Sequence, residues 1–409
     1  MSIRSPSIGL LPLLSCISRS GQHAHPSISV PPRLAAASLI LVIAACDADV
    51  QDEANPIVSL HRQLGGDATG YSRACGPREF NFPDDHAAHP DFRNEWWYVT
   101  GNLRSTDNVD FGFHATFFRI ATTAPEAKAN VALKTSASSW STTQFYMGHF
   151  AISESGKSNL QAHERFARAA AGLAGATKDK TDTKIWLDDW QLRHQSGQQS
   201  DSWTLKLNDG GDALQLSMTA QKPIVLQGID GYSQKSSDPC NASYYYSIPR
   251  MTVTGIVETA GQTHQVTGSA WLDREWSSSA LADDQVGWDW FALQLNDGRD
   301  IMFYRLRKRD GTIDPQSHAV IIEQDGSKRS LTLPEYSVDR WWSSPSGARY
   351  PTSGRLIFSA DDYSDTIIVE PLLDNQELNL TVRYWEGAIK LSDINGQSLG
   401  KGYLELTGY

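Results

Sequence analysis

The feature that most constrains the fold is a long series of short apolar segments separated by turn sequences. Asp-Gly pairs at residues 209–210, 297–298, 310–311 and 325–326 each follow one such segment and precede another. These pairs favour the tight turns of antiparallel hairpins, because both residues tolerate positive φ angles. The segments are rich in aromatic and β-branched residues, which favour strands. The chain of 409 residues is therefore predicted to be all-β.

The segments form two series that look distantly alike. Each series opens with a Trp-rich acidic strand, EWWYVTGNL at residues 95–103 and SAWLDREW at residues 269–276, and continues with an aromatic strand that ends in an arginine. Short, evenly spaced strands with Gly-rich turns favour barrels or sandwiches. We expect two related β-barrels in tandem, packed side by side, at residues 81–260 and 261–409.

Helix is expected at one place only, residues 162–171, where the sequence HERFARAAA carries good helix formers.

The densest mixture of charges and indoles lies at residues 268–295. Side chains alternate along a strand, so Asp273 and Glu275 are expected on one face and Arg274 and Trp276 on the other. Buried charges are costly unless they are paired. The stretch therefore either braces a core with ion pairs or forms a site, and the sequence leaves both interpretations open.

Bulk properties exclude several classes of function. The net charge of −11, without a basic run, argues against a nucleic-acid partner. The sequence has no HExxH helix, no phosphate-binding glycine loop and no CxxC pair. Its GxSxG string, at residues 396–400, lies between two expected strands, whereas a nucleophile elbow joins a strand to a helix. A serine-hydrolase mechanism is thus unsupported, and neither a cofactor nor a metal is expected.

The N-terminus resembles a targeting segment. The apolar run LAAASLILVIAAC ends in Ile-Ala-Ala-Cys at Cys46, like a bacterial lipobox with cleavage before the cysteine and lipid attached to it. An ordinary cleaved signal or an anchor helix is the alternative. We take residues 1–46 as a lipoprotein signal segment and residues 47–80 as a polar tether. Asp47 resembles an inner-membrane retention signal, so a periplasmic, lipid-anchored protein is expected.

Two cysteines then remain in the mature chain, Cys75 and Cys240. In an oxidising compartment such a pair often forms a disulfide. A disulfide and two free buried thiols both remain open.

The longer motifs are similar to a known family. HPDFRNEWWYVTGNL, FGFHATFFR, TGSAWLDREWSS, QVGWDWFALQLNDGRDIMFYRLR and GYLELTGY resemble the lipocalin-like family often labelled predicted secreted hydrolase. It includes AttH and is more distantly related to carotenoid 1,2-hydratase of the CrtC type and to kievitone hydratase. The resemblance runs over residues 82–409 and implies two lipocalin-like barrels. The hydratases add water to a carbon–carbon double bond and tend to carry a histidine where this chain has Arg274.

Acid-catalysed hydration needs a carboxylic acid that stays protonated and an aromatic wall that stabilises a carbocation. Asp273 is the first candidate for the acid, and Asp289 and Glu275 are further catalytic candidates. The alternative for Asp273 is an ion pair with Arg274 or with a partner such as Arg119, which would lower its pKa. The candidate substrate-binding residues are Trp271, Trp276, Trp288, Trp290, Tyr304 and Tyr384.

Other polar residues have structural interpretations. Glu95 and Glu386 each neighbour a tryptophan and are expected to cap buried arginines; the alternative is that each completes a site in one barrel. His114 and His149 lie in aromatic strands and are expected to be hydrogen-bonded core residues. A tyrosine run at residues 244–246 fits a strand edge or a contact between barrels better than a ligand cavity. Two histidines are expected on the surface, namely His163 and His194.

Two functional hypotheses follow. The first is a membrane-tethered periplasmic protein that binds an apolar small molecule, an isoprenoid or a lipid, and adds water to or isomerises its double bond. The second is a non-enzymatic ligand carrier or chaperone-like accessory of an inner-membrane ABC-transporter permease.

Overall fold

The computed structural model describes residues 67–125, 140–179, 182–197, 201–278, 281–360 and 363–409. The expected signal segment, the lipidation candidate Cys46 and most of the expected tether lie outside these residues. Within them, no helix has the length and apolarity needed to cross a bilayer.

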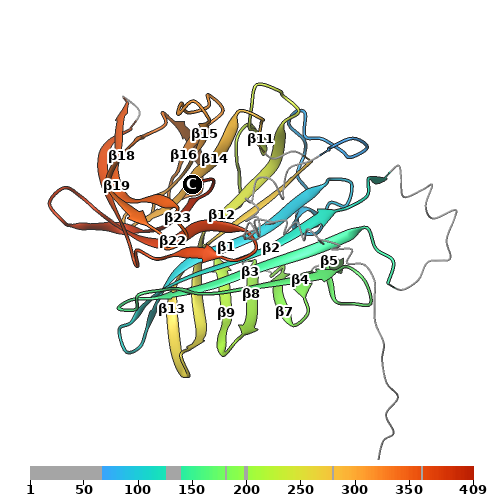
Figure 1. The fold of residues 1–409 in the computed structure, drawn as a ribbon, viewed down its shortest axis with the longest axis horizontal. Helices are drawn as coiled ribbons and strands as arrows, with labels where there is room; N and C mark the ends of the chain where they lie inside the picture. Colours follow the sequence, from blue (N-terminus) through green and yellow to red (C-terminus); the bar gives the residue numbers. More distant parts are fainter. Residues whose placement is uncertain (1–66, 126–139, 180–181, 198–200, 279–280, 361–362) are drawn as a thin grey trace, which may run out of the picture. The chain divides into compact units, whose positions relative to one another are not determined.

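Two antiparallel sheets contain the named strands of the described chain (Figure 1). The first sheet comprises β1 (Asn94–Ser105), β2 (Asp110–Ala121), β3 (Gln144–Glu154), β4 (Gln161–Arg168), β5 (Ala174–Asp179), β6 (Asp182–Leu187), β7 (Trp190–Gln195), β8 (Ser202–Asp209), β9 (Asp212–Ala220), β10 (Val225–Leu226), β11 (Tyr232–Gln234), β12 (Ala242–Thr259) and β13 (Gln262–Ser277). The second comprises β14 (Gln285–Leu295), β15 (Asp300–Lys308), β16 (His318–Ile322), β17 (Lys328–Leu331), β18 (Glu335–Ser343), β19 (Arg349–Ala360), β20 (Tyr363–Pro371), β21 (Glu377–Asn379), β22 (Arg383–Ser392) and β23 (Ser398–Leu406). A short 3-10 segment, η1 (Asp84–His86), precedes β1.

The two sheets share one topology. Their strand orders are β4-β3-β2-β1-β13-β12-β9-β8-β7-β6-β5 and β17-β16-β15-β14-β23-β22-β20-β19-β18. In each sheet the first strand pairs with the last, and the two edge strands are consecutive in the chain, as in a sheet that curls into a barrel. The predicted all-β fold of two tandem lipocalin-like barrels, packed side by side, is confirmed.

The division between the two sheets lies after β13. The boundary expected at residues 260 and 261 falls in the turn between β12 and β13. Yet β13 pairs with β1 along its length, from Asn94 opposite Ser277 to Ser105 opposite Val266. Because these hydrogen bonds join β13 to the first sheet, the second sheet begins only with β14.

The helix expected at residues 162–171 is wrong. The structure places β4 there, paired in register with β3 from Phe145 opposite Arg168 to Ile152 opposite Gln161. Local helix propensity is a weak preference, and the unpaired edge of β3 offers a full row of backbone hydrogen bonds that overrides it.

Strand alternation builds aromatic cores inside each barrel and between the two sheets. On β1, Trp97 and Val99 point into the first barrel, while Trp96 and Tyr98 point toward the second sheet. The interior of the second barrel is filled by residues such as Phe291 and Phe303, whose rings stack at 4.4 Å. The cluster between the sheets unites side chains from both: Tyr98, Tyr245, Trp271, Trp290, Met302, Tyr304, Ala388 and Tyr403.

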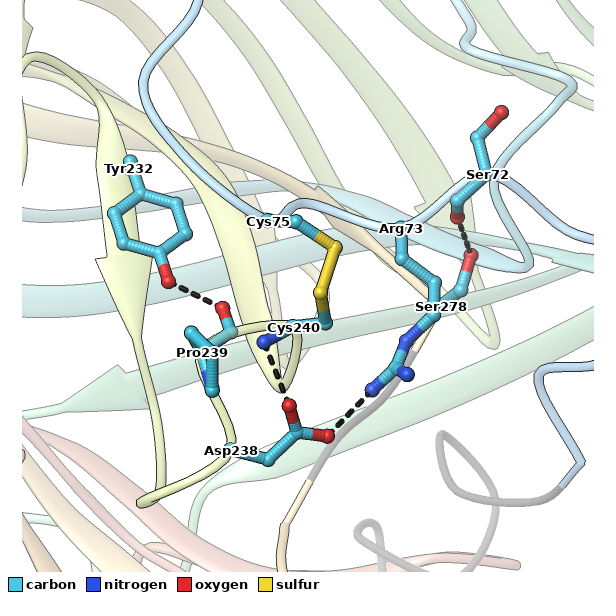
Figure 2. Close-up of a disulfide and its surroundings, with 8 residues drawn as sticks. All are labelled: Ser72, Arg73, Cys75, Tyr232, Asp238, Pro239, Cys240 and Ser278. Atoms are coloured by element: carbon cyan, nitrogen blue, oxygen red, sulfur yellow. Dashed lines mark hydrogen bonds and ion pairs between the residues drawn. A yellow bond between two sulfur atoms is a disulfide. The ribbon is translucent and has the colours of Figure 1, made fainter.

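Cys75 and Cys240 form a disulfide, the pairing that the sequence leaves open (Figure 2). Beside it, Arg73 pairs with Asp238 at 2.8 Å. The bond fastens the segment before β1 to the loop between β11 and β12.

A buried ion-pair group lies inside the first barrel. Glu95 on β1 pairs with Arg119 on β2 and with Arg274 on β13, and all three side chains are essentially inaccessible to solvent. The guanidinium of Arg274 also lies 3.9 Å from the ring centroid of Trp97. Glu95 therefore caps two internal arginines, as expected, and the arginines lower its pKa against the effect of burial.

Removing the charge of Glu95 should strongly destabilise the protein. In Glu95→Gln two buried guanidiniums lose their counterion, so we expect the free energy of unfolding to fall by about 3–5 kcal/mol. Urea unfolding measures this. The control is Arg355→Ala, which breaks the exposed pair with Asp339 at 2.8 Å and should change stability by less than about 1 kcal/mol. Equal effects of the two substitutions would contradict the central role of Glu95.

Candidate active site between the sheets

A cavity lies between the two sheets, and its wall is largely aromatic. About 100 Å³ is open to the centres of water-sized molecules, against the roughly 10–15 Å³ that one water needs. The aromatic lining residues are Trp96, Tyr98, Phe118, Tyr245, Trp288, Trp290, Tyr304 and Tyr384. The charged or ionisable lining residues are Asp273, Glu275, Glu386, Glu405 and Lys235. Such an apolar, concave wall with a few convergent polar groups is typical of a small-molecule site.

Alternation along β13 brings two of these acids to the cavity. Asp273 and Glu275 line it, while Arg274 and Trp276 point into the first barrel. This is the division of faces that the sequence predicts. The alternation separates Asp273 from its sequence neighbour Arg274, which forms an ion pair with Glu95.

Asp273 is buried and hydrogen-bonded but has no arginine partner among the described residues. Its carboxylate accepts hydrogen bonds from Tyr245 Oη at 2.5 Å, Ser247 Oγ at 2.5 Å and Trp271 Nε1 at 2.6 Å. Burial raises the pKa of Asp273 to about 7, although the three hydrogen bonds oppose the shift. The carboxyl group therefore exchanges its proton near neutral pH, as a general acid must.

Two further acids lie opposite each other on neighbouring strands of the second sheet. Glu386 on β22 lies directly opposite Glu405 on β23. Burial raises the pKa of Glu405 to about 8, and the nearby Asp273 and Glu275 add to the shift. Burial and Glu405 together raise the pKa of Glu386 well above its ordinary value. Glu405 is thus mainly a neutral acid at pH 7, and the shift of Glu386 has the same direction.

Among the described residues no arginine pairs with Glu386, so the expected cap is not observed; Glu386 lines the cavity instead. Its Oε2 lies 3.2 Å from Nε2 of His114, and that nitrogen also contacts Thr116 Oγ1 at 2.6 Å. Burial lowers the pKa of His114 well below its ordinary value. The expected hydrogen-bonded core role of His149 is observed, since its Nδ1 lies 2.7 Å from Tyr384 Oη.

Glu275 is held in an ion pair. Its carboxylate lies 3.1 Å from Lys235 Nζ and accepts a hydrogen bond from Ser243. Burial opposes the charge of Lys235, but Glu275 raises the pKa of the lysine above its ordinary value. Lys235 Nζ also lies 4.5 Å from the ring centroid of Tyr304. The cavity therefore holds one fixed ion pair beside three acids with raised pKa values.

Comparison with known proteins decides the family. Residues 73–409 match the model of the AttH-like family. The chain belongs to the AttH-like family. The solved structure of an AttH protein from Nitrosomonas europaea is 33% identical, with a TM-score of 0.70, and the match covers 83% of this chain and 99% of that one. No curated protein sequence matches this chain.

A more distant structure shares the fold of this AttH-like protein. Kievitone hydratase from Nectria haematococca is 13% identical, with a TM-score of 0.59, and the match covers 83% of this chain and 98% of that one. At this identity the likeness concerns the fold alone.

Six of the predicted site residues of the AttH-like protein line the cavity: Asp273, Glu275, Trp288, Trp290, Tyr304 and Tyr384. Trp271 lies one layer behind, where it donates to Asp273 and packs edge-on against Trp290 at 6.2 Å. Trp276 lies inside the first barrel, stacked on His89 at 3.8 Å. It is therefore not placed to bind a ligand of this cavity.

Asp289 is not placed to act as the acid. It sits between Trp288 and Trp290 on β14, so alternation turns it away from the cavity that both tryptophans line. There it accepts a hydrogen bond from Arg307 at 2.9 Å and lies 3.7 Å from Arg305. Asp289 thus forms the ion pairs with arginines that the sequence also allowed for Asp273.

The sequence interpretation missed several lining residues of the AttH-like protein. Glu405 stands in the apolar strand YLELTGY, and an acid in such a strand is a signal of a buried partner or a site. Tyr245 belongs to the tyrosine run, and alternation separates it from both neighbours, which face the first barrel. Lys235 follows β11 in an irregular loop and carries no comparable signal.

The raised pKa values predict how stability depends on pH. Asp273 shifts from 3.8 to about 7 and Glu405 from 4.5 to about 8, so the folded protein holds protons that the unfolded chain has lost. Each group's contribution is complete below its unfolded pKa and is lost as pH rises to its folded pKa, by about 1.4 kcal/mol per pH unit.

We expect Asp273→Asn to flatten this fall between about pH 5 and pH 7, because the amide cannot ionise. Urea unfolding at a series of pH values measures the slope. Asp310→Asn, at an exposed turn, serves as the control and should keep the wild-type slope. If Asp273→Asn also keeps that slope, the carboxyl group is not protonated in the folded protein.

Proposed function

We propose that this protein binds an apolar small molecule, an isoprenoid or another lipid-like compound, in the cavity between its barrels and adds water to, or isomerises, a carbon–carbon double bond. The observation that carries the proposal is the state of Asp273. It is a buried carboxyl group without an arginine partner among the described residues, it lines an aromatic cavity, and its pKa is about 7.

The proposed reaction needs only Asp273, the aromatic wall and one water molecule, and Asp273 regains its proton at the end. Protonated Asp273 gives its proton to one carbon of the double bond, and the other carbon becomes a cation. The faces of Trp288 and Trp290 stabilise that charge. Water then adds to the cation, and a proton of the water returns to the Asp273 carboxylate. In the isomerisation a proton leaves the carbon next to the cation instead, and Asp273 accepts it.

Neighbouring groups position the acid. Tyr245 and Ser247 donate to the two carboxylate oxygens of Asp273 and fix its orientation. Glu405, with a pKa of about 8, adds little charge that would trap the cation, and the raised pKa of Glu386 acts in the same direction. A relative in fold, kievitone hydratase, bears the name of a hydratase, and this supports the reaction class.

A second candidate is a non-enzymatic carrier or chaperone-like accessory of an inner-membrane ABC-transporter permease. The three hydrogen bonds to Asp273 favour it, because donors aimed at a carboxylate also serve as purely structural braces. In either case the proposed setting is the periplasm, with lipid on Cys46 as the membrane anchor.

The ligand is identified first. The protein is purified without its lipid anchor, and apolar molecules that remain bound are analysed by mass spectrometry. The identified compound is then incubated with the protein, and addition of one water, or a change in double-bond position, is followed by chromatography and mass spectrometry.

We expect Asp273→Asn to lower kcat by at least about 100-fold, since a general acid contributes about 10²–10⁴-fold, while the Kd of the compound stays near the wild-type value. Asp289→Asn is the matched control, because that aspartate is buried but faces away from the cavity, and it should keep turnover in whatever fraction folds. Equal turnover in wild type and Asp273→Asn removes the catalytic assignment. Binding without turnover in the wild type selects the carrier instead.

A further inference from the structure

Three side chains that could coordinate a metal ion lie together in the first barrel, apart from the cavity between the sheets. His86 ends η1, His194 lies on β7, and Asp201 stands directly before β8. One ligand atom from each of these three side chains lies within 4.8 Å of the other two. His86 thus meets two residues that stand more than a hundred positions later in the sequence.

Strand alternation turns His194 inward. On β7, Trp190, Leu192 and His194 are buried while Arg193 and Gln195 are exposed. The surface position expected for His194 is therefore wrong. His163, by contrast, is only partly buried and pairs with Asp212 at 2.9 Å.

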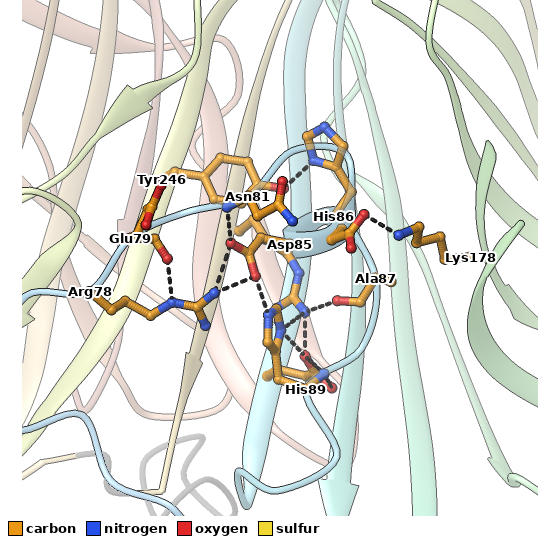
Figure 3. Close-up of polar contacts among 12 residues, drawn as sticks. Arg78, Glu79, Asn81, Asp85, His86, Ala87, His89, Lys178 and Tyr246 are labelled. Carbon is orange, nitrogen blue, oxygen red and sulfur yellow. Dashed lines mark hydrogen bonds and ion pairs between the residues drawn. The ribbon is translucent and has the colours of Figure 1, made fainter. Parts of the chain in front are cut away.

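His86 is held rigidly against this wall. Its carbonyl oxygen accepts a hydrogen bond from Trp97 Nε1 at 2.8 Å. Its neighbour Asp85 accepts hydrogen bonds from Arg78, at 2.8 Å, and lies 2.9 Å from His89 Nε2, as Figure 3 shows. The His86 side chain is completely buried, and its ring centroid lies 4.3 Å from that of His194.

Several polar atoms at this point lack hydrogen-bond partners among the described residues. They include Nε2 of His86 and both ring nitrogens of His194. His194 Nε2 lies 3.5 Å from Asp201 Oδ1, at the outer limit of a hydrogen bond. Thr183, directly opposite His194 on β6, has a buried hydroxyl that is also without a partner there. Unsatisfied buried polar atoms are rare in proteins, and three of them at one place, beside a fourth that reaches only the distant Asp201 oxygen, point to a bound ligand.

Tyr246 prepares His86 to act as a ligand. Tyr246 Oη lies 2.5 Å from Nδ1 of His86 (Figure 3). When Nδ1 donates its hydrogen to the phenol, Nε2 keeps a free lone pair that can bind a metal ion. A hydrogen bond to the second ring nitrogen is the usual way in which proteins orient a metal-binding histidine.

We propose that His86, His194 and Asp201 bind a divalent transition-metal ion of the zinc type. Two imidazoles and one carboxylate are ligands that suit Zn²⁺, with a fourth position for water or the Thr183 hydroxyl. The ion joins the segment that enters the barrel at η1 to the wall strands β7 and β8. Its role is structural, and it is independent of the cavity between the sheets.

Zinc titration of the folded, chelator-treated protein tests the site. We expect about one Zn²⁺ per chain by elemental analysis, a rise of Tm when Zn²⁺ is added back, and a visible absorption spectrum of low-coordinate Co²⁺ when cobalt replaces zinc. Asp201→Asn, whose side chain is 38% exposed and so tolerates change, should weaken zinc binding by at least about tenfold. Tyr246→Phe should weaken it by about 10–100-fold through the lost hydrogen bond.

The matched control is His163→Gln, which removes a histidine of the same barrel that pairs with an aspartate outside the cluster. It should leave zinc affinity and the cobalt spectrum unchanged. Absence of zinc binding by the wild type overturns the proposal and assigns the unpartnered atoms to buried water. Equal zinc affinity in wild type, Asp201→Asn and Tyr246→Phe overturns it as well, because zinc then binds elsewhere.

Discussion

The ion pairing of Glu95 with Arg119 and Arg274 is the interaction on which the rest of the site depends. Asp273 and Arg274 are neighbours in sequence, and in a flexible chain they would neutralise each other. The strand sends them to opposite faces, and Glu95 satisfies the guanidinium on the barrel side. Asp273 is thereby left without an arginine partner on the cavity side, so burial raises its pKa, and the nearby Glu275 adds to the shift. A structural network in one barrel thus sets the chemistry of the space beside it.

The acids of the cavity reinforce one another. Asp273, Glu275 and Glu405 stand near enough for their charges to interact, and Glu386 faces Glu405 across neighbouring strands. Each carboxylate that ionises makes the next ionisation harder, since little water screens the charges. Lys235 forms an ion pair with Glu275, and the nearby Asp273 also helps to raise the pKa of the lysine. The space therefore favours neutral acids next to indoles, which is an unusual combination outside functional sites.

Much of the fold was predictable because its signals are local. Asp-Gly turns and aromatic alternation identify strands without any knowledge of their partners, and the same alternation assigns the two faces around Arg274. It could also have set aside Asp289, which stands between two tryptophans that face the other way. The strand β4 was missed because its pairing with β3 is a tertiary contact that outweighs helix propensity. The pairing of Glu386 with Glu405, and the meeting of His86 with His194, depend on the register of distant strands, which no local pattern encodes.

The lining of the cavity also determines which ligands the cavity excludes. Its one basic side chain, among the described residues that line it, is already engaged with Glu275. A fatty acid that entered head first would bury its carboxylate in an apolar space and would find no free cation there to pair with it. An uncharged hydrocarbon or alcohol has no charge to bury. The cost of burying an unpaired charge, rather than a specific contact, would therefore exclude anionic lipids. The wall of the cavity is otherwise apolar enough to hold their chains.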